Sequence, residues 1–310
     1  MNDDPFSDVL GLINARSVVS GSLTAGGAWA IRFPASDRIN FWGIARGECW
    51  CITESEDTPL KLEAGDFLLR ASPRAAVLTT DPQVKPVHFE ELAVSSAGNT
   101  RHHGVGDEFL IIGGKVDFDE KLGAPLLGLL PPTLLVRHGS VHATVLQWLL
   151  SQLVRERADA LPGVAAASAQ LAHLMFIQIL RAHLDADATL APGWLRLLGD
   201  RRLAPAVRLL HREPARAWGL EELARACSMS RATFAAHFKA VAAITPVAYL
   251  TQLRMRFAER SLREGDTAVS AIGYALGYSS ESAFSSAFKR FAGEAPSRYR
   301  ANTRSSRTAS

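Results

Sequence analysis

The chain has 310 residues, of which 47% are hydrophobic, and a formal net charge of only +3, so it is long enough for two domains with separate cores. No apolar run reaches the ~18 residues that a membrane span needs, and no basic and apolar leader precedes a cleavage site. We therefore expect a cytoplasmic protein without membrane contact, and its three cysteines are too few for a disulfide framework.

Charge is distributed unevenly along the chain. Residues 1–140 hold 12 Lys and Arg against 18 Asp and Glu, a net charge of −6, whereas residues 216–310 hold 14 against 7, a net charge of +7. A basic C-terminal third behind an acidic N-terminal part is typical of a polyanion-binding module attached to another domain. A basic surface that is merely solvated would have the same charge, so charge alone leaves both interpretations open.

Short strand-like runs follow one another from about residue 22 to residue 120. They lie at 26–34, 38–53, 58–72, 74–80 and 107–118, with turn residues at 34–37, 54–57 and 95–99. Many short, evenly spaced strands predict a β-sandwich or small barrel. Cys49 and Cys51 lie two apart in one run and point to one face, and we interpret them as packing thiols rather than as a metal or redox pair.

Beyond residue 140 the apolar pattern becomes helical. A first amphipathic helix carries Leu149 and Leu153 on its apolar face, and a second helix extends to about His183. These two helices either cap the β-domain or pair with a second subunit. Residues 186–199 have the composition of a linker, and a new helix begins at Leu203.

The C-terminal part contains one short motif twice. Ser-x-x-x-Phe-x-x-x-Phe-Lys occurs at residues 230–239 and again at 280–289. In each copy a short helix and a tight turn precede the serine, which is a favourable N-cap, and both phenylalanines fall on the buried face of the next helix. The pattern predicts two helix-turn-helix units, at residues 220–241 and 269–291, whose second helices suit a DNA major groove.

A longer helix is predicted between the two units. Pro246 occupies a favoured first-turn position, and the apolar pattern stops at Gly265. About 17 residues at 1.5 Å each span ~25 Å, so this helix can hold two recognition helices about one DNA turn, ~34 Å, apart. The duplication therefore predicts that one subunit reads two successive major-groove segments.

Specific residues strengthen this interpretation. They are Ala271-Ile272-Gly273, Gly277-Tyr278, Ser280-Glu281-Ser282-Ala283-Phe284, Phe288-Lys289, Gly293, Pro296 and Tyr299-Arg300. Through them, residues 200–303 resemble the DNA-binding domain of the AraC/XylS family of bacterial transcription regulators. Another set lies nearer the N-terminus, at residues 46–50, 62–66 and 118–119 with 125–127 and 130–132. Through it, that part is similar to the cupin-like regulatory domain of one branch of the family.

The resemblance implies an α+β multidomain protein. It implies a cupin-like β-barrel at residues 1–140 that senses an effector, a helical dimerisation pair at 141–190 and an all-α DNA-binding domain at 200–303 with two helix-turn-helix motifs. It further implies a homodimer on double-stranded promoter DNA, contact with RNA polymerase if the protein is an activator, and no cofactor. The sequence leaves activator and repressor both open.

The resemblance also implies which residues face the DNA. In the family, bases are usually read from the third, sixth and seventh positions after the helix start. The implied contact residues, with the serine caps and flanking basic residues, are Ser230, Arg231, Ala232, Ala235, Ala236, Lys239, Ser280, Ser282, Ala283, Ser286, Lys289 and Arg290. The family often has arginine where Ala236 and Ser286 stand. We therefore expect specificity to rest on small contacts, DNA shape and dimerisation.

The predicted β-domain lacks a metal-binding pattern. Metal-binding cupins supply histidines from adjacent strands, but Trp42 and Ala76 stand where related domains often have histidine. His88 and the pair His102-His103 lie in loop-like stretches without ligand spacing, so we expect no metal site.

A small organic effector is the more favoured ligand of the β-domain, with Trp29, Trp42 and Trp50 as its candidate pocket. A purely structural domain that acts through protein contacts stays open as the alternative. The rival function is a cupin-type metal-dependent enzyme with a nucleic-acid-binding appendage, which would need a facial His/carboxylate set that the sequence does not display. We therefore predict a regulator with no catalytic residues.

Overall fold

The computed structural model describes residues 4–12, 15–53, 58–94, 100–118, 130–159, 161–185 and 192–308. The chain divides into two compact units: residues 14–190 form one, and residues 1–13 join residues 191–310 in the other. The expected turns at 54–57 and 95–99, the first part of the expected linker (186–191) and the family motif at 119 and 125–127 lie outside the described residues.

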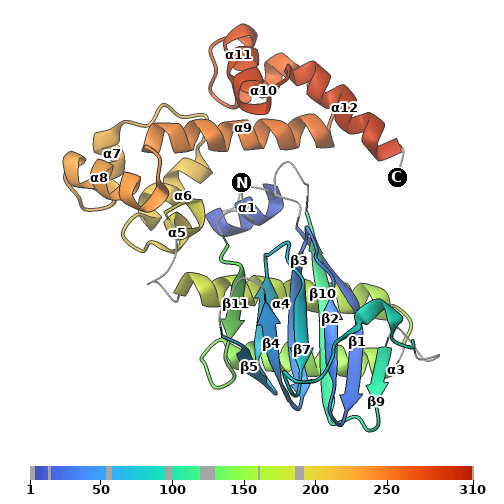
Figure 1. Ribbon diagram of the computed structural model, residues 1–310. Coiled ribbons are helices and arrows are strands. Elements are labelled where there is room, and N and C mark those ends of the chain that lie inside the picture. Colours follow the sequence, from blue (N-terminus) through green and yellow to red (C-terminus); the bar gives the residue numbers. More distant parts are fainter. Residues whose placement is uncertain are drawn as a thin grey trace. The chain divides into compact units, whose positions relative to one another are not determined.

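The first unit contains two β-sheets (Figure 1). Its strands are β1 (Arg16–Gly26), β2 (Ala30–Phe33), β3 (Ile39–Arg46), β4 (Glu48–Thr53), β5 (Leu60–Glu63), β6 (Phe67–Arg70), β7 (Ala76–Thr79), β8 (Val87–His88), β9 (Thr100–Gly104), β10 (Phe109–Asp117) and β11 (Thr133–Val136), with a 3-10 helix η1 (Phe89–Glu91). One sheet has the order β11-β6-β3-β10-β1-β9 and the other β5-β4-β7-β2-β8. The expected β-domain is confirmed, although its strands divide into two sheets instead of closing into one barrel.

The core of this unit draws on both sheets. Leu23 and Ile44 of the six-stranded sheet belong to the same buried cluster as Cys49, Cys51 and Leu78 of the five-stranded sheet. Alternation along the strands produces this arrangement, because every second side chain points to the same face. The interpretation of the two cysteines as packing thiols is consistent with their burial.

Two helices, α3 (Ala143–Asp159) and α4 (Val164–Asp185), pack against each other and against the six-stranded sheet at β1, β3, β10 and β11. Leu149 and Leu153 of α3 are 2% and 0% exposed, so they bury against their own unit. The apolar face predicted from the sequence is therefore buried within the unit, and these two leucines are not available for a subunit interface.

Helix α4 is long and apolar enough, by length and composition, to cross a membrane, and so is the bent pair of α8 (Arg231–Ala242) and α9 (Pro246–Glu264) if the two helices are taken as one span. In α4, Met175 and Phe176 are fully buried within the unit. The core helix of a folded soluble protein passes this test too, so the result is weak evidence for a membrane span.

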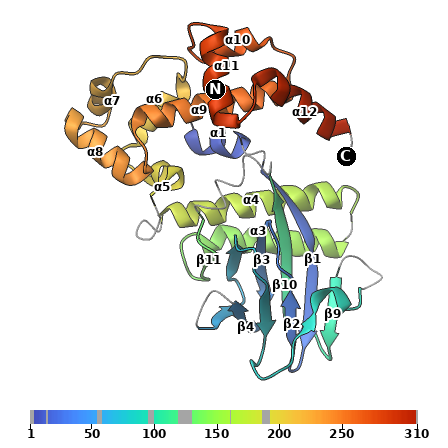
Figure 2. The same ribbon diagram turned by 45° about the horizontal axis from the view of Figure 1, so that its top comes forward.

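The second unit is helical. Its helices are α1 (Pro5–Leu12), α5 (Trp194–Gly199), α6 (Ala204–Arg212), α7 (Leu220–Ala226), α8 (Arg231–Ala242), α9 (Pro246–Glu264), α10 (Val269–Ala275), α11 (Glu281–Ala292) and α12 (Pro296–Thr308). The expected linker at 186–199 is thus helical in its last six residues. Figure 2 shows α9 running from the α7–α8 pair to the α10–α11 pair.

Helix α9 supplies one side of two separate cores. Tyr249, Leu250 and Leu253 belong to the cluster that contains Phe234 and Phe238 of the first helix-turn-helix. Farther along the helix, Met255, Ala258 and Leu262 belong to the cluster of the second helix-turn-helix. The two units are therefore mounted on one continuous helix.

Candidate nucleic-acid interface

The two helix-turn-helix units begin their second helices in the same way. The Ser230 hydroxyl accepts a hydrogen bond from the Thr233 amide at 3.1 Å, and the Ser280 hydroxyl accepts one from the Ala283 amide at 3.1 Å. Each bond satisfies an amide that would otherwise lack a partner in the first turn. Both N-caps predicted from the repeated motif are confirmed.

The turns differ by one residue but use the same backbone device. Ser228 has φ 54° and Gly277 has φ 84°, both in the left-handed region. After each, the next amide returns to the preceding helix: Met229 donates to the Ala224 carbonyl, and Tyr278 donates to the Gly273 carbonyl. Glycine adopts this conformation freely, whereas serine does so at some cost.

The buried faces of α8 and α11 are also matched. Phe234 and Phe238 are fully buried with ring centroids 5.7 Å apart, and Phe284 and Phe288 are fully buried with centroids 5.9 Å apart. These aromatic pairs fix which face of each helix points into the core. The opposite face of each helix is therefore the one that remains for a ligand.

Most of the residues proposed to face DNA lie on those outer faces. On α8 and its cap the exposed ones are Ser230, Arg231, Ala232, Ala236 and Lys239, and on α11 they are Ser282, Ala283, Ser286, Lys289 and Arg290. Ala235 and Ser280 are half-buried. Each unit thus gathers small side chains between basic ones, which is an arrangement able to approach base edges and phosphates together.

Several polar contacts in this unit escaped the sequence analysis. His237 of α8 has its Nε2 atom 2.9 Å from the Oδ2 atom of Asp200, whose other oxygen accepts from the amides of Arg202 and Leu203. Asp200 thereby links the start of α6 to α8. A contact between residues 37 positions apart leaves no periodic signal in the sequence.

The β-rich unit contains a cavity of about 730 Å³, a volume typical of small-molecule sites. Its aromatic lining is Phe33, Trp42 and Phe89, and its charged lining is Asp37, Arg38, Arg70, Glu90, Arg101 and Lys115. The Arg70 guanidinium lies 5.6 Å from the centroid of the Trp42 ring, and Arg70 is 2% exposed. The wall therefore combines aromatic surface with a buried positive charge.

Of the three tryptophans proposed for a pocket, only Trp42 lines this cavity. Trp29 is 1% exposed and packs on Phe109 with ring centroids 4.7 Å apart. Trp50 is half-buried on β4 and alternates with the buried residues Cys49 and Cys51, so it lies on the other face of its sheet.

No metal cluster is found in the part of the chain that the structure describes. No group of three or more His, Cys, Asp or Glu side chains there could hold a metal ion. Burial raises the pKa of the Cys49 thiol far above its usual range, and Cys51 and Asp66 raise it further. A thiol with a raised pKa is a poor nucleophile.

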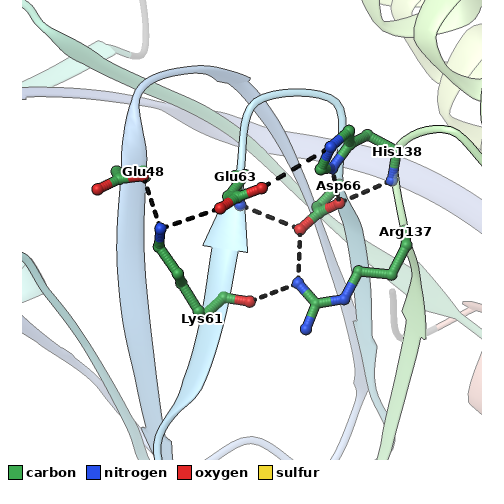
Figure 3. A network of polar contacts seen from close by, with 6 residues as sticks. All are labelled: Glu48, Lys61, Glu63, Asp66, Arg137 and His138. Carbon is green, nitrogen blue, oxygen red and sulfur yellow. Dashed lines mark hydrogen bonds and ion pairs between the residues drawn. The ribbon is translucent and has the colours of Figure 1, made fainter.

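Figure 3 shows a polar network around Asp66, which is fully buried at the turn between β5 and β6. Its carboxylate accepts from the amides of Glu63 at 3.0 Å and His138 at 2.7 Å, and from the Arg137 guanidinium at 3.0 Å. The His138 Nδ1 atom lies 3.0 Å away. Arg137 also donates to the Lys61 carbonyl, so the network ties this turn to the segment between β11 and α3.

Two family models match the chain. The model described as Cupin matches residues 4–185, and the model described as Helix-turn-helix domain matches residues 223–302. The first match includes α1, which the structure groups with the helical unit.

Similar proteins are named as transcription regulators. A "Putative AraC-like transcription regulator" of Streptomyces lividans is 38% identical over 96% of this chain and 98% of its own length. The "HTH-type transcriptional regulator AlkR" of Acinetobacter baylyi is 31% identical over 88% of this chain and 91% of its own. Among solved structures, the DNA-binding domain of AdpA, described as in complex with a target DNA, matches 36% of this chain and 100% of its own at 29% identity, with a TM-score of 0.34.

Proposed function

The chain belongs to the AraC-like transcription regulators, and on that premise we propose that it acts as a homodimer whose subunits each read two successive major-groove segments. It is a DNA-binding transcription regulator with a cupin N-terminal domain and a helix-turn-helix C-terminal domain. We place it in the cytoplasm, where promoter DNA and RNA polymerase are its partners, and we assign it no catalytic activity.

The observation that supports two-segment reading is the sharing of one helix by both units. Helix α9 has 19 residues, about 28 Å at 1.5 Å per residue, which is close to the ~34 Å between successive major-groove segments. The outer faces of α8 and α11 both remain exposed in this arrangement. The length of α9 and the two exposed faces support the proposal that one subunit contacts two segments.

Footprinting tests this proposal on the duplex that the full-length chain selects from randomised DNA. We expect each subunit to protect two major-groove segments about one turn apart. Affinity should fall by about 10³ to 10⁵ between 50 and 200 mM salt if six to ten phosphates are contacted. Protection of a single segment per subunit, or binding that salt does not weaken, would contradict the proposal.

We propose that the dimer forms through the side chains of α3 and α4 that remain exposed on the β-rich unit. Val145 and Trp148 on α3 are 46% and 59% exposed, and Leu174 on α4 is 46% exposed. Trp148→Glu should therefore give a monomer in light scattering, whereas Val105→Glu should not, because Val105 is an 89% exposed apolar residue between β9 and β10 rather than on α3 or α4. A folded Trp148→Glu variant that stays dimeric would exclude this surface.

We propose a small organic anion as the effector, bound in the 730 Å³ cavity. Trp42 offers an aromatic surface, and Arg70 and Arg101 offer positive charge. In thermal-shift assays with aromatic carboxylic acids and their neutral amides, only the acids should raise the Tm of the protein. The Trp42→Leu substitution should abolish this increase. If no acid raises Tm, the domain acts through protein contacts instead.

The enzyme alternative has less support. It requires a His/carboxylate set around a metal, and the described residues offer no group of three such side chains. A stoichiometric metal in the purified full-length chain would favour it again.

A further inference from the structure

Arg254, in the middle of α9, contacts the segment that leads into the first helix-turn-helix. Its Nε atom donates to the Pro214 carbonyl at 2.6 Å, and its Nη2 atom donates to the carbonyls of Ala215 at 3.2 Å and Arg216 at 3.0 Å. All three carbonyls belong to segment 213–219, which leads from α6 into α7. One planar guanidinium thus holds the entry to the first unit.

The same guanidinium lies against the turn of the second helix-turn-helix. Its central carbon is 5.9 Å from the centroid of the Tyr278 ring. The neighbouring Gly277 approaches the segment directly, since a Cβ atom there would lie 2.1 Å from the Ala215 carbonyl oxygen. Segment 213–219 is therefore enclosed between α9 and the second turn, and only glycine fits at position 277.

Contacts within segment 213–219 carry this restraint on to α7. The Trp218 indole donates to the Glu213 carbonyl at 3.0 Å, and the Arg216 guanidinium lies 4.1 Å from the centroid of the Trp218 ring. Arg216 also forms an ion pair with Glu222, which lies in the first turn of α7. The segment is therefore held at both ends.

We propose that Arg254 is a positioning residue that fixes the separation and rotation of the two helix-turn-helix units, and thereby the spacing of the two DNA segments that one subunit accepts. The proposal rests on the two-segment reading described above. Both units also pack on α9 through apolar side chains, but such contacts are not directional. Hydrogen bonds to three carbonyls are directional, and they define one orientation.

Lysine cannot replace arginine in this role. The guanidinium presents several N–H groups in a fixed plane and stacks on an aromatic ring, whereas an ammonium is a point donor on a flexible stem. An Arg254→Lys variant keeps the charge and most of the packing volume but cannot hold segment 214–216 and the Tyr278 ring together.

The test uses the full-length chain and the duplex it selects from randomised DNA, with zero or one base pair inserted between the two segments read by one subunit. Wild type should bind the inserted duplex more weakly by about 5- to 150-fold, the cost of one lost base-pair contact. In Arg254→Met and Arg254→Lys the affinities for the original and the inserted duplex should differ by no more than about threefold, because the second unit can reorient. Arg260→Met removes the same charge from the same helix, where Arg260 pairs with exposed Glu264, and should keep the wild-type ratio.

The outcomes distinguish the Arg254 proposal from the two-segment proposal on which it rests. If wild type is indifferent to the insertion, two-segment reading fails and the Arg254 proposal fails with it. If wild type is selective and the folded Arg254 variants bind every duplex less tightly with an unchanged ratio, Arg254 only stabilises the fold and the proposal is overturned. Arg254→Lys decides the question should Arg254→Met not fold.

Discussion

The Nδ1 atom of His211 lies 3.1 Å from the Oδ2 atom of Asp8, although 203 residues separate them in the chain. The other ring nitrogen of His211 lies 2.7 Å from the Tyr249 hydroxyl, so the imidazole links α1 to α9 through α6. His211 is fully buried and Leu12 of α1 is 4% exposed. Helix α1 is therefore part of the core of the DNA-binding unit, and only residues 13–15 separate it from strand β1.

Removal of the Asp8 carboxylate should loosen the helical unit. Asp8→Ala leaves the buried His211 ring without that partner, at a cost of about 1–3 kcal/mol. Amide hydrogen exchange in peptides from α6 and α9 should then accelerate by about 5- to 150-fold if exchange follows opening of the unit. Arg212→Ala changes the exposed neighbour of His211 and should leave these rates within about twofold. Equal rates in wild type and Asp8→Ala would show that α1 is not integrated into this core.

The two helix-turn-helix units were predictable because their signals are local. A serine cap bonds an amide three residues away, and Phe234 and Phe238 share a face because four residues complete about one helical turn. The position of α1 was not predictable, since eight residues carry little pattern and their partners lie some 200 positions away. Likewise β9 pairs in parallel with β1, a contact that no local alternation encodes.

Periodicity also identified buried faces without identifying what buries them. Leu149 and Leu153 were predicted to lie on an apolar face, and they are buried within their own unit, where α3 packs on α4 and β3, whereas the neighbouring Trp148 is exposed. The tryptophans show the same limit. Trp42 and Trp50 lie on different sheets, and their residue type gives no information about which face of a strand they occupy.

The Asp66 network should make the β-rich unit sensitive to acid. Burial acts to raise the pKa of Asp66, but hydrogen bonds from His138, Glu63 and Arg137 hold it below its usual range. A lowered folded-state pKa means that the contribution is present above the unfolded pKa, ~3.9, and is lost as pH falls through the folded value.

Asp66→Asn should therefore lower the free energy of unfolding at pH 7 by about 1.5–3 kcal/mol, since it replaces hydrogen bonds to a charged group. The difference from wild type should shrink at pH values below the folded-state pKa of Asp66. Urea unfolding followed by circular dichroism, at pH 7 and at a pH below the folded-state pKa of Asp66, measures this difference in unfolding free energy. Asp117→Asn, at an exposed ion pair with Arg38, should cost less than about 1 kcal/mol at either pH. A pH-independent difference for Asp66→Asn would contradict the assignment.

The two recognition helices should respond differently to loss of thymine methyl groups. The outer face of α8 offers the methyl groups of Ala232 and Ala236, whereas α11 offers the hydroxyls of Ser282 and Ser286. Deoxyuridine in place of thymidine removes only the methyl group. In the segment read by α8 each effective replacement should weaken binding about fourfold, from ~0.8 kcal/mol per buried methylene-sized group. Replacements in the α11 segment should change affinity less, and equal effects in both segments would contradict this assignment.

Arginine substitutions at the same faces should change specificity in a defined way. Ala236→Arg and Ser286→Arg each place a guanidinium on an exposed position of α8 or α11. Affinity for any duplex should rise, because a positive charge near the groove acts on all sequences. Selection from randomised duplexes should also shift each variant toward guanine at one position, favoured by about 1–3 kcal/mol over other bases.

The positions of those guanines provide the sharper check. The guanine selected by Ala236→Arg should lie about one DNA turn from the one selected by Ser286→Arg, and the double variant should require both. Phe234→Arg is the control for a charge on the wrong face, because it buries an unpaired guanidinium in the core and should unfold the unit rather than alter its preference. Folded arginine variants that retain wild-type affinity and preference would mean that these two positions do not face the bases.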